Sequence, residues 1–571
     1  MNTLLKALTA PSIKRNLLFL LIILGTFYIY STALTGPFIW DDEHFVLRNP
    51  SITSFEKLPE YFISKETYSM EGTVDIYRPL RNVSYLIDYL LFGLNPFGFH
   101  FVNVILHVQN IILLACLVRV MTGSNFMAMV SSALFAFHPV QTEAVSWIKG
   151  RDDLIATFFY LTSLTLYIKG RDKGGYLYWG SVISFALALL SKEMAVTLPL
   201  VIFLYNLHFP RQGGSRSSYH PYMYLLLLYL LIRTVVVGGV AQANYWGGGF
   251  PANVYTNWTG MVYYLKLLFF PVNLCADYLM FPVRTSIFDL YVIGAISVIL
   301  FLLGVTVLSF RKGNRLLSFS ISWFFIALLP VSNLVPIEAT IAERFLYLPS
   351  IGIFIGGAVL LSHFSKGALS GHKPVMSLIA VISIFLGSMT VDRNHVWTDE
   401  HLFWQDVIDK SPGNTRALHN LASGYQNKGK ITEAVFFYKK ALTMEYHSPE
   451  THFQLGRIYR GLGEDETAMT EFFEALKDDP QNADYHYEIG NLMSKKEWYS
   501  EAIFQYKKVL ESKPDHEDAL YDLGIMYMKQ KDYALAAVQF EKLLIIVPGN
   551  KMAAGFLDYC RNTGNMGNMG S

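Results

Sequence analysis

Long apolar runs occupy the first two thirds of the chain and predict helices that cross a membrane. A helix needs about 20 apolar residues to span a bilayer, and eleven segments approach that length. These segments are residues 15–35, 98–120, 125–141, 152–169, 176–190, 195–209, 220–240, 287–309, 316–334, 344–362 and 375–391. Two more apolar stretches, 258–273 and 80–93, are interpreted as interfacial or re-entrant helices. Residues 258–273 are not counted as a span because a span there would place the basic loop at 311–315 on the outer side. Residues 80–93 are not counted because they contain the charged residues Arg81 and Asp88.

Basic residues between the runs predict the orientation of these helices. Lys and Arg side chains gather in alternate loops, which the positive-inside rule assigns to the cytoplasm. The residues assigned to the cytoplasm are Lys14, Arg15, Arg119, Lys169, Arg171, Lys173, Arg211, Arg216, Arg311, Lys312, Arg315, Lys366 and Lys373. An odd number of spans then places the C-terminal region outside. The outer loops are residues 36–97, 142–151, 191–194, 241–286 and 335–343.

From residue 398 the pattern changes to a repeat of 34 residues, in which small, aromatic, glycine and proline positions recur. These positions are Ala434, Ala468, Ala502 and Ala536; Tyr438, Phe472, Tyr506 and Phe540; Gly456, Gly490 and Gly524; and Pro480, Pro514 and Pro548. This is the period and pattern of the tetratricopeptide repeat (TPR), a pair of packed helices. Four full repeats cover about 414–547, and helices at 398–410 and near 550–562 are expected to cap the stack.

The two patterns together predict an all-α protein. Residues 1–397 form a polytopic membrane domain, 398–562 form a TPR α-solenoid, and the Gly- and Asn-rich residues 563–571 form a disordered tail. Composition agrees, because 16% of the residues are charged where soluble domains carry about 25%. A net charge of +1 without a long basic run gives nucleic-acid binding no support, and the three scattered cysteines show no disulfide framework or zinc spacing.

Candidate chemistry lies in the outer loops, beginning with Asp41-Asp42-Glu43 just after the first span. Acidic residues at a bilayer boundary are costly unless they pair, bind a ligand or face water. The other outer loops and the ends of the adjoining spans add Arg78, His138, Glu143, Arg151, Asp152, Asp153, Lys192, Glu193, Glu343 and Arg344. Each cluster alone could be a hydrophilic loop, a helix cap or an ion pair. Their convergence on one membrane face favours a shared site.

Carboxylates can act as a general base, and cations can hold a phosphate. This combination suits group transfer from a phosphate-linked lipid whose tail lies between spans. A transporter would show acids near the bilayer midplane and broken helices in two internal repeats, and neither is evident. His107 lies mid-span, where a lone histidine is more often a packing residue than a ligand. Ionisable groups at that depth are rare enough to keep it as a candidate.

The membrane half and the repeats together resemble the transmembrane and tetratricopeptide-containing protein O-mannosyltransferases, a family of the GT-C glycosyltransferase superfamily. The motifs that carry the resemblance are FIWDDEHFVLRNP, YRPLRNVSYLIDYLLFGLNPFGFHFVNVILH, FHPVQTEAVSWIKGRDDL, SKEMAVTLP and AERFLYLPSIG, in this order. The resemblance implies inverting transfer of mannose or another hexose from a polyprenyl (dolichyl-type) phosphate donor to serine or threonine hydroxyls of an exported protein. It also implies that the TPR array engages this acceptor.

The resemblance also implies roles for individual residues. Asp41, with Asp42 as a close rival, matches the catalytic acid and would accept the hydroxyl proton as general base. The candidate residues for binding donor phosphate or substrate are Arg78, His107, His138, Glu143, Arg151, Asp153, Lys192, Glu193, Glu343 and Arg344. The extra acid at Asp152 leaves the choice between Asp153 and Asp152 open. Cations would stabilise the leaving phosphate, and Glu193 and Glu343 would hold them. A divalent metal could bind the carboxylates, but no ligand spacing calls for one, so the lipid-linked sugar is the one cosubstrate expected.

Two other functions stay open. A non-enzymatic membrane scaffold for a surface complex would explain the repeats, but it needs one span and no clustered charges. An enzyme acting on a lipid or glycan acceptor is disfavoured by an array of the peptide-binding type. The membrane is either a bacterial plasma membrane, with the repeats outside, or the endoplasmic reticulum membrane, with the repeats lumenal. The compact loops favour a prokaryotic protein.

Overall fold

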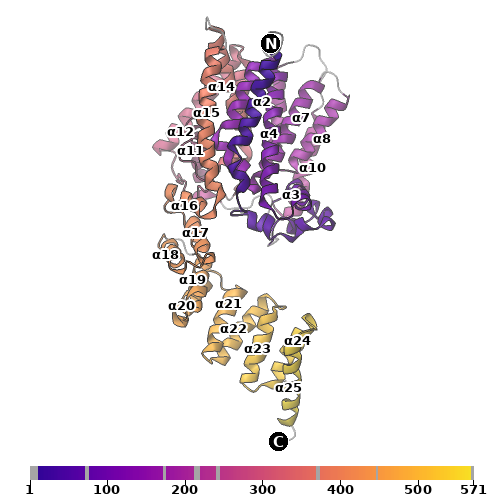
Figure 1. Cartoon of the computed structure of the whole chain (residues 1–571), viewed down its shortest axis with the longest axis vertical. Coiled ribbons are helices and arrows are strands. Elements are labelled where there is room, and N and C mark those ends of the chain that lie inside the picture. Colours follow the sequence, from indigo (N-terminus) through magenta and orange to yellow (C-terminus); the bar gives the residue numbers. More distant parts are fainter. Residues whose placement is uncertain are drawn as a thin grey trace, which may run out of the picture. The chain divides into compact units, whose positions relative to one another are not determined.

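The computed structural model describes residues 11–70, 76–171, 175–210, 219–239, 245–337, 339–367, 373–444 and 448–567. All regular secondary structure in these ranges is helical, which confirms the predicted all-α class. The chain divides into two compact units, a membrane unit at Met1–Pro412 and a repeat unit at Gly413–Ser571 (Figure 1).

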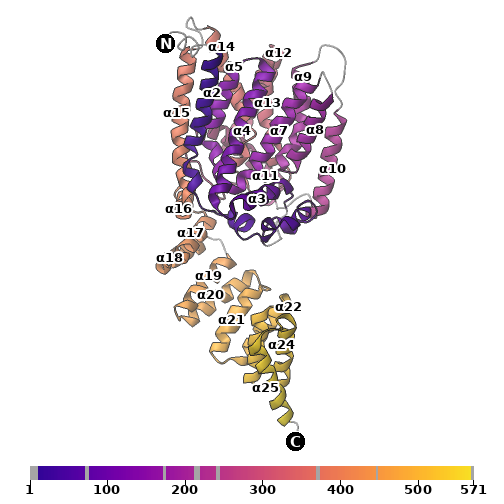
Figure 2. The same ribbon diagram turned by 45° about the vertical axis from the view of Figure 1, so that its right-hand side comes forward.

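The membrane unit is a bundle of long helices with short helical turns between them (Figure 2). Its α-helices are α2 (Pro11–Ile29), α3 (Pro79–Phe92), α4 (Pro96–Thr122), α5 (Asn125–Phe137), α6 (Thr142–Ser146), α7 (Arg151–Gly170), α8 (Gly175–Leu189), α9 (Leu198–His208), α10 (His220–Val237), α11 (Phe250–Phe269), α12 (Leu290–Arg311), α13 (Arg315–Leu328), α14 (Ser350–Gly367), α15 (Lys373–His395) and α16 (Glu400–Lys410). Its turns are η1 (Thr32–Thr35), η2 (Glu43–Leu47), η3 (Pro50–Thr53), η4 (Phe55–Lys57), η5 (Pro59–Phe62), η6 (Lys65–Thr67), η7 (Pro139–Gln141), η8 (Ile148–Gly150), η9 (Glu193–Thr197), η10 (Trp246–Gly248), η11 (Leu329–Val331), η12 (Glu343–Leu346) and η13 (Val396–Thr398).

Every predicted span overlaps a helix of this unit, although several helices are shorter than the predicted spans. Among the described residues, five segments are long and apolar enough to cross a membrane by themselves, namely Asn16–Thr35, Pro96–Thr122, His220–Val237, Leu290–Arg311 and Pro374–Thr398. Shorter apolar helices occupy most of the other predicted spans. The chain is an integral membrane protein, and the number of eleven spans stays a prediction.

Connections between the membrane helices gather at two ends of the bundle. At one end, Arg171 Nη1 donates to the Phe209 carbonyl at 2.9 Å and Arg315 Nη1 donates to the His208 carbonyl at 3.1 Å. Arg311 ends α12 at this same end, where the chain turns into α13. The basic loops therefore lie opposite the loops that carry the candidate acids, as the predicted orientation requires. Of the basic residues used for that orientation, Lys173, Arg211 and Arg216 lie outside the described residues.

Helix α11 begins and ends near the same end of the bundle. Its Asn253 Nδ2 donates to the Asn333 carbonyl at 2.7 Å, in the connection that follows α13. At its other end, the Leu268 carbonyl accepts a 3.0 Å hydrogen bond from His138 Nε2, directly after α5. Both partners belong to connections at the end with the candidate acids. The contacts agree with an interfacial helix rather than a twelfth span.

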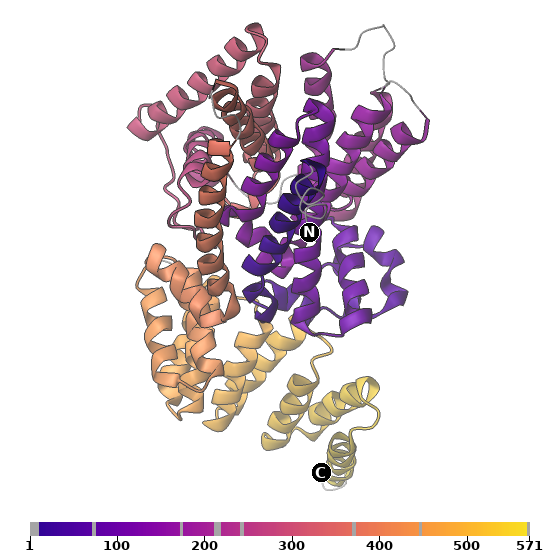
Figure 3. The same ribbon diagram turned by 45° about the horizontal axis from the view of Figure 1, so that its top comes forward.

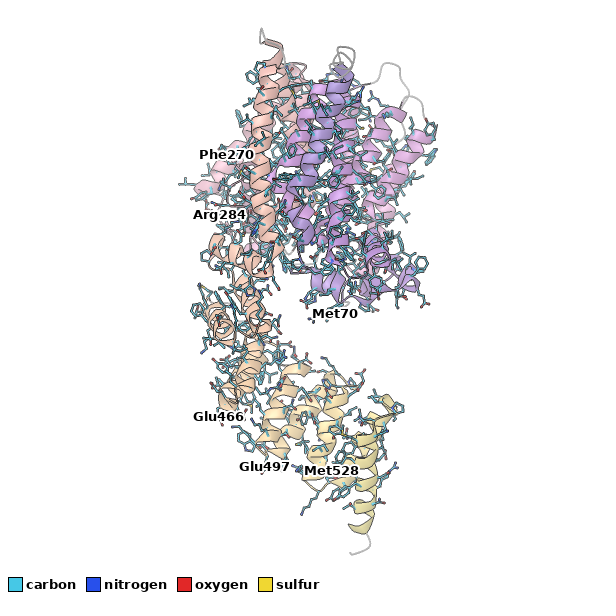
Figure 4. The ribbon with its side chains drawn as sticks, in the orientation of Figure 1. Met70, Phe270, Arg284, Glu466, Glu497 and Met528 are labelled. Atoms are coloured by element: carbon cyan, nitrogen blue, oxygen red, sulfur yellow. The ribbon has the colours of Figure 1, made fainter. Side chains whose placement is uncertain are left out.

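The repeat unit is a stack of helix pairs (Figure 3). Its helices are α17 (Thr415–Asn427), α18 (Ile431–Leu442), α19 (Pro449–Gly461), α20 (Asp465–Asp478), α21 (Ala483–Lys495), α22 (Tyr499–Ser512), α23 (Glu517–Lys529), α24 (Tyr533–Ile546) and α25 (Lys551–Gly567). The turn inside each pair needs one residue with positive φ, and these residues are again 34 apart. They are Gly429, Gly463, Glu497 and Lys531, with φ of 72°, 80°, 61° and 65°; Glu497 is labelled in Figure 4. The predicted TPR fold is confirmed.

Two boundaries differ from the sequence expectation. Helix α16, predicted to cap the repeats, belongs to the membrane unit, because Phe403 and Trp404 pack against Trp40. Helix α25 continues to Gly567, so part of the tail predicted to be disordered is helical. Residues 568–571 of that tail lie outside the described residues.

Two glycines of α19 provide a test of the repeat packing. A Cβ added to Gly456 would lie 2.5 Å from the Phe472 ring, whereas a Cβ on Gly461 would meet nothing within 4 Å. We expect Gly456→Ala to destabilise the repeat unit by about 1–3 kcal/mol through overpacking. Gly461→Ala should be neutral or stabilise it by up to ~1 kcal/mol, because alanine favours a helix. Thermal unfolding of the two variants checks this, and equal effects would contradict the packing described.

Candidate active site

The charged residues predicted on separate loops meet at one end of the membrane unit. They come from the segment before η2, from η8 and the first turn of α7, from the turn into η9, from η12 and from the residue that precedes α3. In Figure 1 this is the lower end of the membrane unit, where α3 and α16 are drawn. Met70 of the first loop is labelled at the same end in Figure 4. The predicted convergence is therefore present in the fold.

One ion-pair network joins the first, second and third outer loops. Arg78 Nη2 contacts Glu193 Oε2 at 2.8 Å, and Arg78 Nη1 pairs with Asp152. Lys192 Nζ lies 3.2 Å from Asp152 Oδ1 and 2.5 Å from Asp153 Oδ2. Burial would raise the pKa of Glu193, but Arg78 outweighs it and holds that pKa below its usual value. Asp152, left as an alternative to Asp153, is the acid that bridges both cations.

A second ion pair places the arginine of the last outer loop. Arg344 Nη1 pairs with Glu143, and the Arg344 backbone N–H donates to Glu143 Oε2 at 2.9 Å. The guanidinium carbon also lies 5.1 Å from the centre of the Trp147 ring. Glu143 is fully buried, while 18% of the Arg344 side chain is exposed. Arg344 is therefore fixed on one side and accessible on the other, as an anion-binding residue must be.

Asp41 and Asp42 occupy different environments although they are adjacent. Asp42 is buried, and its two carboxylate oxygens accept backbone N–H groups of Ile39 at 3.2 Å and of Lys149 at 2.9 Å. Burial raises the pKa of Asp42 to about 7. Asp41 is 29% exposed and pairs with Lys149 Nζ. Asp42 therefore holds two loops together, and Asp41 is the carboxylate that a substrate can reach.

Lys149 is a member of the site that sequence reasoning did not single out, although it lies inside the quoted FHPVQTEAVSWIKGRDDL motif. Its ammonium group pairs with Asp41 and lies 4.2 Å from the centre of the Phe45 ring. Burial lowers the pKa of Lys149, and Asp41 opposes that shift. The lysine one place before Gly150 carried no distinguishing signal, because its partner lies 108 residues away.

Three candidates have side chains that point into the protein instead. Arg151 donates to Asn103 Oδ1 at 2.7 Å, to the Phe99 carbonyl at 2.5 Å and to Asp88. His107 in α4 is buried and hydrogen bonded to the Tyr347 hydroxyl at 2.7 Å. His138 directly follows α5; it accepts from the Val140 N–H and donates to the Leu268 carbonyl. Their predicted role in binding donor or substrate stays a prediction, since these contacts also suffice to explain them as structural residues.

Glu343 faces a different cation from the one expected. Its Oε1 accepts a 2.9 Å hydrogen bond from the Tyr278 hydroxyl, and its Oε2 lies 3.7 Å from Nη2 of Arg393 in α15. Arg344, the neighbour it was predicted to hold, is paired with Glu143 instead. Burial raises the pKa of Glu343 to about 7, against the charge of Arg393.

The raised pKa of Glu343 leads to a predicted pH dependence of the free energy of unfolding. Because its folded pKa lies above its unfolded value, the folded protein binds a proton that the unfolded chain releases between about pH 4.5 and 7. The corresponding stabilisation is present at low pH and is lost as the pH rises through that window. Glu343→Gln should reduce the slope by roughly 1–3 kcal/mol over this window, and the part contributed by Asp42, whose pKa is also raised to about 7, should remain. Thermal unfolding from pH 4.5 to 8 measures it, with Glu60→Gln, an exposed acid paired with Lys57, as the control that keeps the wild-type slope.

Within the described residues no group of three or more His, Cys, Asp or Glu side chains is arranged to hold a metal ion. The expectation that no metal is needed stays untested. The same set of side chains offers what phosphate binding requires: two arginines and two lysines, Arg78, Arg344, Lys149 and Lys192, are held by buried or half-buried acids at one end of the bundle.

Comparison with known proteins agrees with a membrane sugar-transferring fold joined to TPR repeats. The family model described as dolichyl-phosphate-mannose-protein mannosyltransferase matches residues 83–237. Tetratricopeptide repeat models match residues 415–447, 456–497 and 487–551. The solved structure of YrrB, a TPR protein with an unusual peptide-binding site, is 20% identical with a TM-score of 0.25, covering 27% of this chain and 80% of its own. A likeness at that level supports no statement about function.

Curated relatives are protein O-mannosyl-transferases. Protein O-mannosyl-transferase F38B6.6 of Caenorhabditis elegans is 29% identical over 454 residues, covering 76% of this chain and 63% of the relative. Human protein O-mannosyl-transferase TMTC4 is 28% identical over 481 residues, covering 72% and 64%, and human TMTC1 is 25% identical over 504 residues, covering 76% and 56%. The resemblance to the transmembrane and TPR-containing protein O-mannosyltransferases is confirmed. The chain spans about three fifths of the length of these relatives.

Proposed function

We propose that this protein is a membrane glycosyltransferase that moves mannose or another hexose from a polyprenyl or dolichyl phosphate to Ser or Thr hydroxyls of exported proteins. One observation carries the proposal: Asp41 is a partly exposed carboxylate in a cluster of cations at one end of a membrane bundle. The dolichyl-phosphate-mannose family model and the names of the relatives support the same activity. A bacterial plasma membrane or the endoplasmic reticulum membrane would hold the protein.

The mechanism follows from the positions of the charges. The hydroxyl oxygen of the acceptor attacks the anomeric carbon while Asp41 accepts the hydroxyl proton. The bond between that carbon and the lipid phosphate breaks in the same displacement, with inversion. Arg344 and Arg78 stabilise the charge that develops on the departing phosphate. Lys149 pairs with Asp41 and orients its carboxylate before reaction. Asp42, the rival for the base, has its carboxylate oxygens occupied by backbone N–H groups.

The repeat unit supplies the place for the acceptor. Stacked TPR helix pairs present a concave surface suited to extended polypeptide, and the proposal assigns that surface to the exported protein. A lipid or glycan acceptor would make no use of it. A scaffold without enzymatic activity would leave the buried ion pairs around Asp41 without a purpose beyond stability.

The direct test is sugar transfer by the purified full-length protein in lipid. Labelled polyprenyl-phosphate mannose is supplied with a pool of exported proteins, and label in protein bands is measured against the same donor without protein. Arg344→Gln should weaken use of the donor, whereas Lys57→Gln, which removes an exposed cation of the first loop, should not. Folded protein that neither binds nor transfers from any lipid-phosphate sugar would overturn the proposal in favour of the scaffold.

A further inference from the structure

We propose that helix α16 is a positioning element for the catalytic site, holding Asp41 through Trp40 and Arg344 through Glu343. The helix ends at Lys410, and the repeat unit begins at Gly413. A helix that positions the site therefore stands directly before the unit assigned to acceptor binding. The roles of Asp41 and Arg344 rest on the proposed function, but the positioning itself concerns the fold and has a test of its own.

The first contact is aromatic and reaches the residue before Asp41. The Trp40 ring centre lies 5.7 Å from that of Trp404 and 5.9 Å from that of Phe403, both on α16. On its other side Trp40 stacks on Trp147 at 4.9 Å with an interplanar angle of 11°. Trp40 is thus held between α16 on one side and Trp147 of the second outer loop on the other.

The backbone at Trp40 shows why this packing is needed. Trp40 has φ of 59°, a left-handed conformation in which a bulky side chain costs about 1–3 kcal/mol. Such a conformation persists only where the surroundings over-determine it. It also sets the direction in which the next residue, Asp41, leaves the chain. Loss of the aromatic support from α16 would let Trp40 relax and would move Asp41 from its contact with Lys149.

The second contact is ionic and reaches the residue before Arg344. Asp406 Oδ2 of α16 accepts a 2.7 Å hydrogen bond from Arg393 Nη1, and Arg393 Nη2 faces Glu343 Oε2 at 3.7 Å. Lys410 Nζ pairs with Asp406 Oδ1 at 2.6 Å and donates to the Leu274 carbonyl at 2.5 Å. Arg393 is nearly buried, at 5% exposure of its side chain. Asp406 of α16 therefore balances the charge of Arg393, and Arg393 in turn faces Glu343 in η12.

The two faces of α16 provide matched controls. Leu402 is exposed on the same helix as the buried Trp404. Asp409 is exposed and accepts from Gln405 within α16, whereas Asp406 reaches into the membrane unit. A helix that only packed for stability would, when Trp404 or Asp406 is changed, loosen the same surroundings in both variants. If α16 positions the site, substitution of Trp404 should affect the loop around Asp41, and substitution of Asp406 the loop around Arg344. Substitutions of Leu402 and Asp409 should affect neither loop.

Amide hydrogen exchange of the full-length protein in lipid, without substrate, tests the positioning directly. Trp404→Ala is expected to raise exchange about tenfold or more at residues 39–45, and Asp406→Asn at residues 341–346. Leu402→Ala and Asp409→Asn should leave both segments as in the wild type. Unchanged exchange at both segments in the two test variants would overturn the proposal. If Trp404→Ala loosens the whole membrane unit, Trp404→Phe decides: raised exchange confined to 39–45 supports the proposal, and wild-type exchange there overturns it.

Transfer kinetics separate the two roles and keep this inference distinct from the proposed function. Trp404→Ala should lower kcat about 10–100-fold at an unchanged KM for the donor, because misplacing the base affects the chemical step. Asp406→Asn should raise the donor KM by about 3–10-fold with a smaller change in kcat, because it loosens Arg344. Equal effects of both variants on kcat, with the donor KM unmoved, would overturn the assignment of Asp406 to η12. A wild-type protein that transfers no sugar would sink the proposed function and leave the exchange result standing.

Discussion

Asp41→Asn is expected to lower sugar transfer by about 10²–10⁴-fold, the range for losing a positioned general base. The substitution removes the partly exposed carboxylate beside Lys149 and keeps the size of the Asp41 side chain. Asparagine has nearly the same shape as aspartate and can still accept from Lys149, and this ion pair is only partly buried, so the melting temperature should change little. Donor binding, measured with the labelled lipid, should also persist, because Arg344 and Arg78 are untouched.

Asp42→Asn is the matched control and should behave in the opposite way. The Asp42 oxygens accept two backbone N–H groups, from Ile39 and Lys149. An asparagine offers one oxygen and one NH₂ group, so one buried N–H donor loses its acceptor, at a cost of about 1–3 kcal/mol. We expect a lower melting temperature and a partial loss of activity that follows the loss of folded protein. A folded, inactive Asp42→Asn beside an active Asp41→Asn would exchange the two roles.

The overall architecture could be predicted because its signals are local in sequence. Apolar runs place each membrane helix, and the 34-residue spacing that includes Gly456 and Gly490 defines the repeats. The interpretation of residues 258–273 as an interfacial or re-entrant helix came from the side on which Arg311 had to lie. In each case a short window or a single charge rule carried the information needed.

The pairing within the site could not be predicted, because it depends on how distant segments pack. The carboxylate partner of Arg151 is Asp88, 63 residues earlier, and the partner of Arg344 is Glu143, 201 residues earlier. The predicted topology places these groups on one membrane face, but it does not indicate which of them pair and which face solvent. The prediction that α16 caps the repeats is wrong for the same reason. Its position next to α17 in the sequence does not reveal that it packs against Trp40.

Arg151→Met should destabilise the membrane unit by about 3–5 kcal/mol, the usual cost of removing one partner of a buried ion pair. Both Arg151 and Asp88 are nearly inaccessible, at 0% and 3% side-chain exposure. Burial already raises the pKa of Asp88, and Arg151 opposes that shift. Without Arg151 the folded protein would favour protonated Asp88, so the destabilisation should grow as the pH rises above the ordinary aspartate range.

The double variant Arg151→Met/Asp88→Leu decides what this pair is for. Replacing a buried ion pair by apolar residues of similar size is often close to neutral, so the double variant should recover most of the stability that Arg151→Met loses. Asn103, which also accepts from Arg151, would account for the part not recovered. Thermal unfolding and binding of the labelled donor, measured on the same samples, separate the two possible roles. A stable Arg151→Met protein with weakened donor binding would instead place Arg151 on the donor phosphate, as the family resemblance implies.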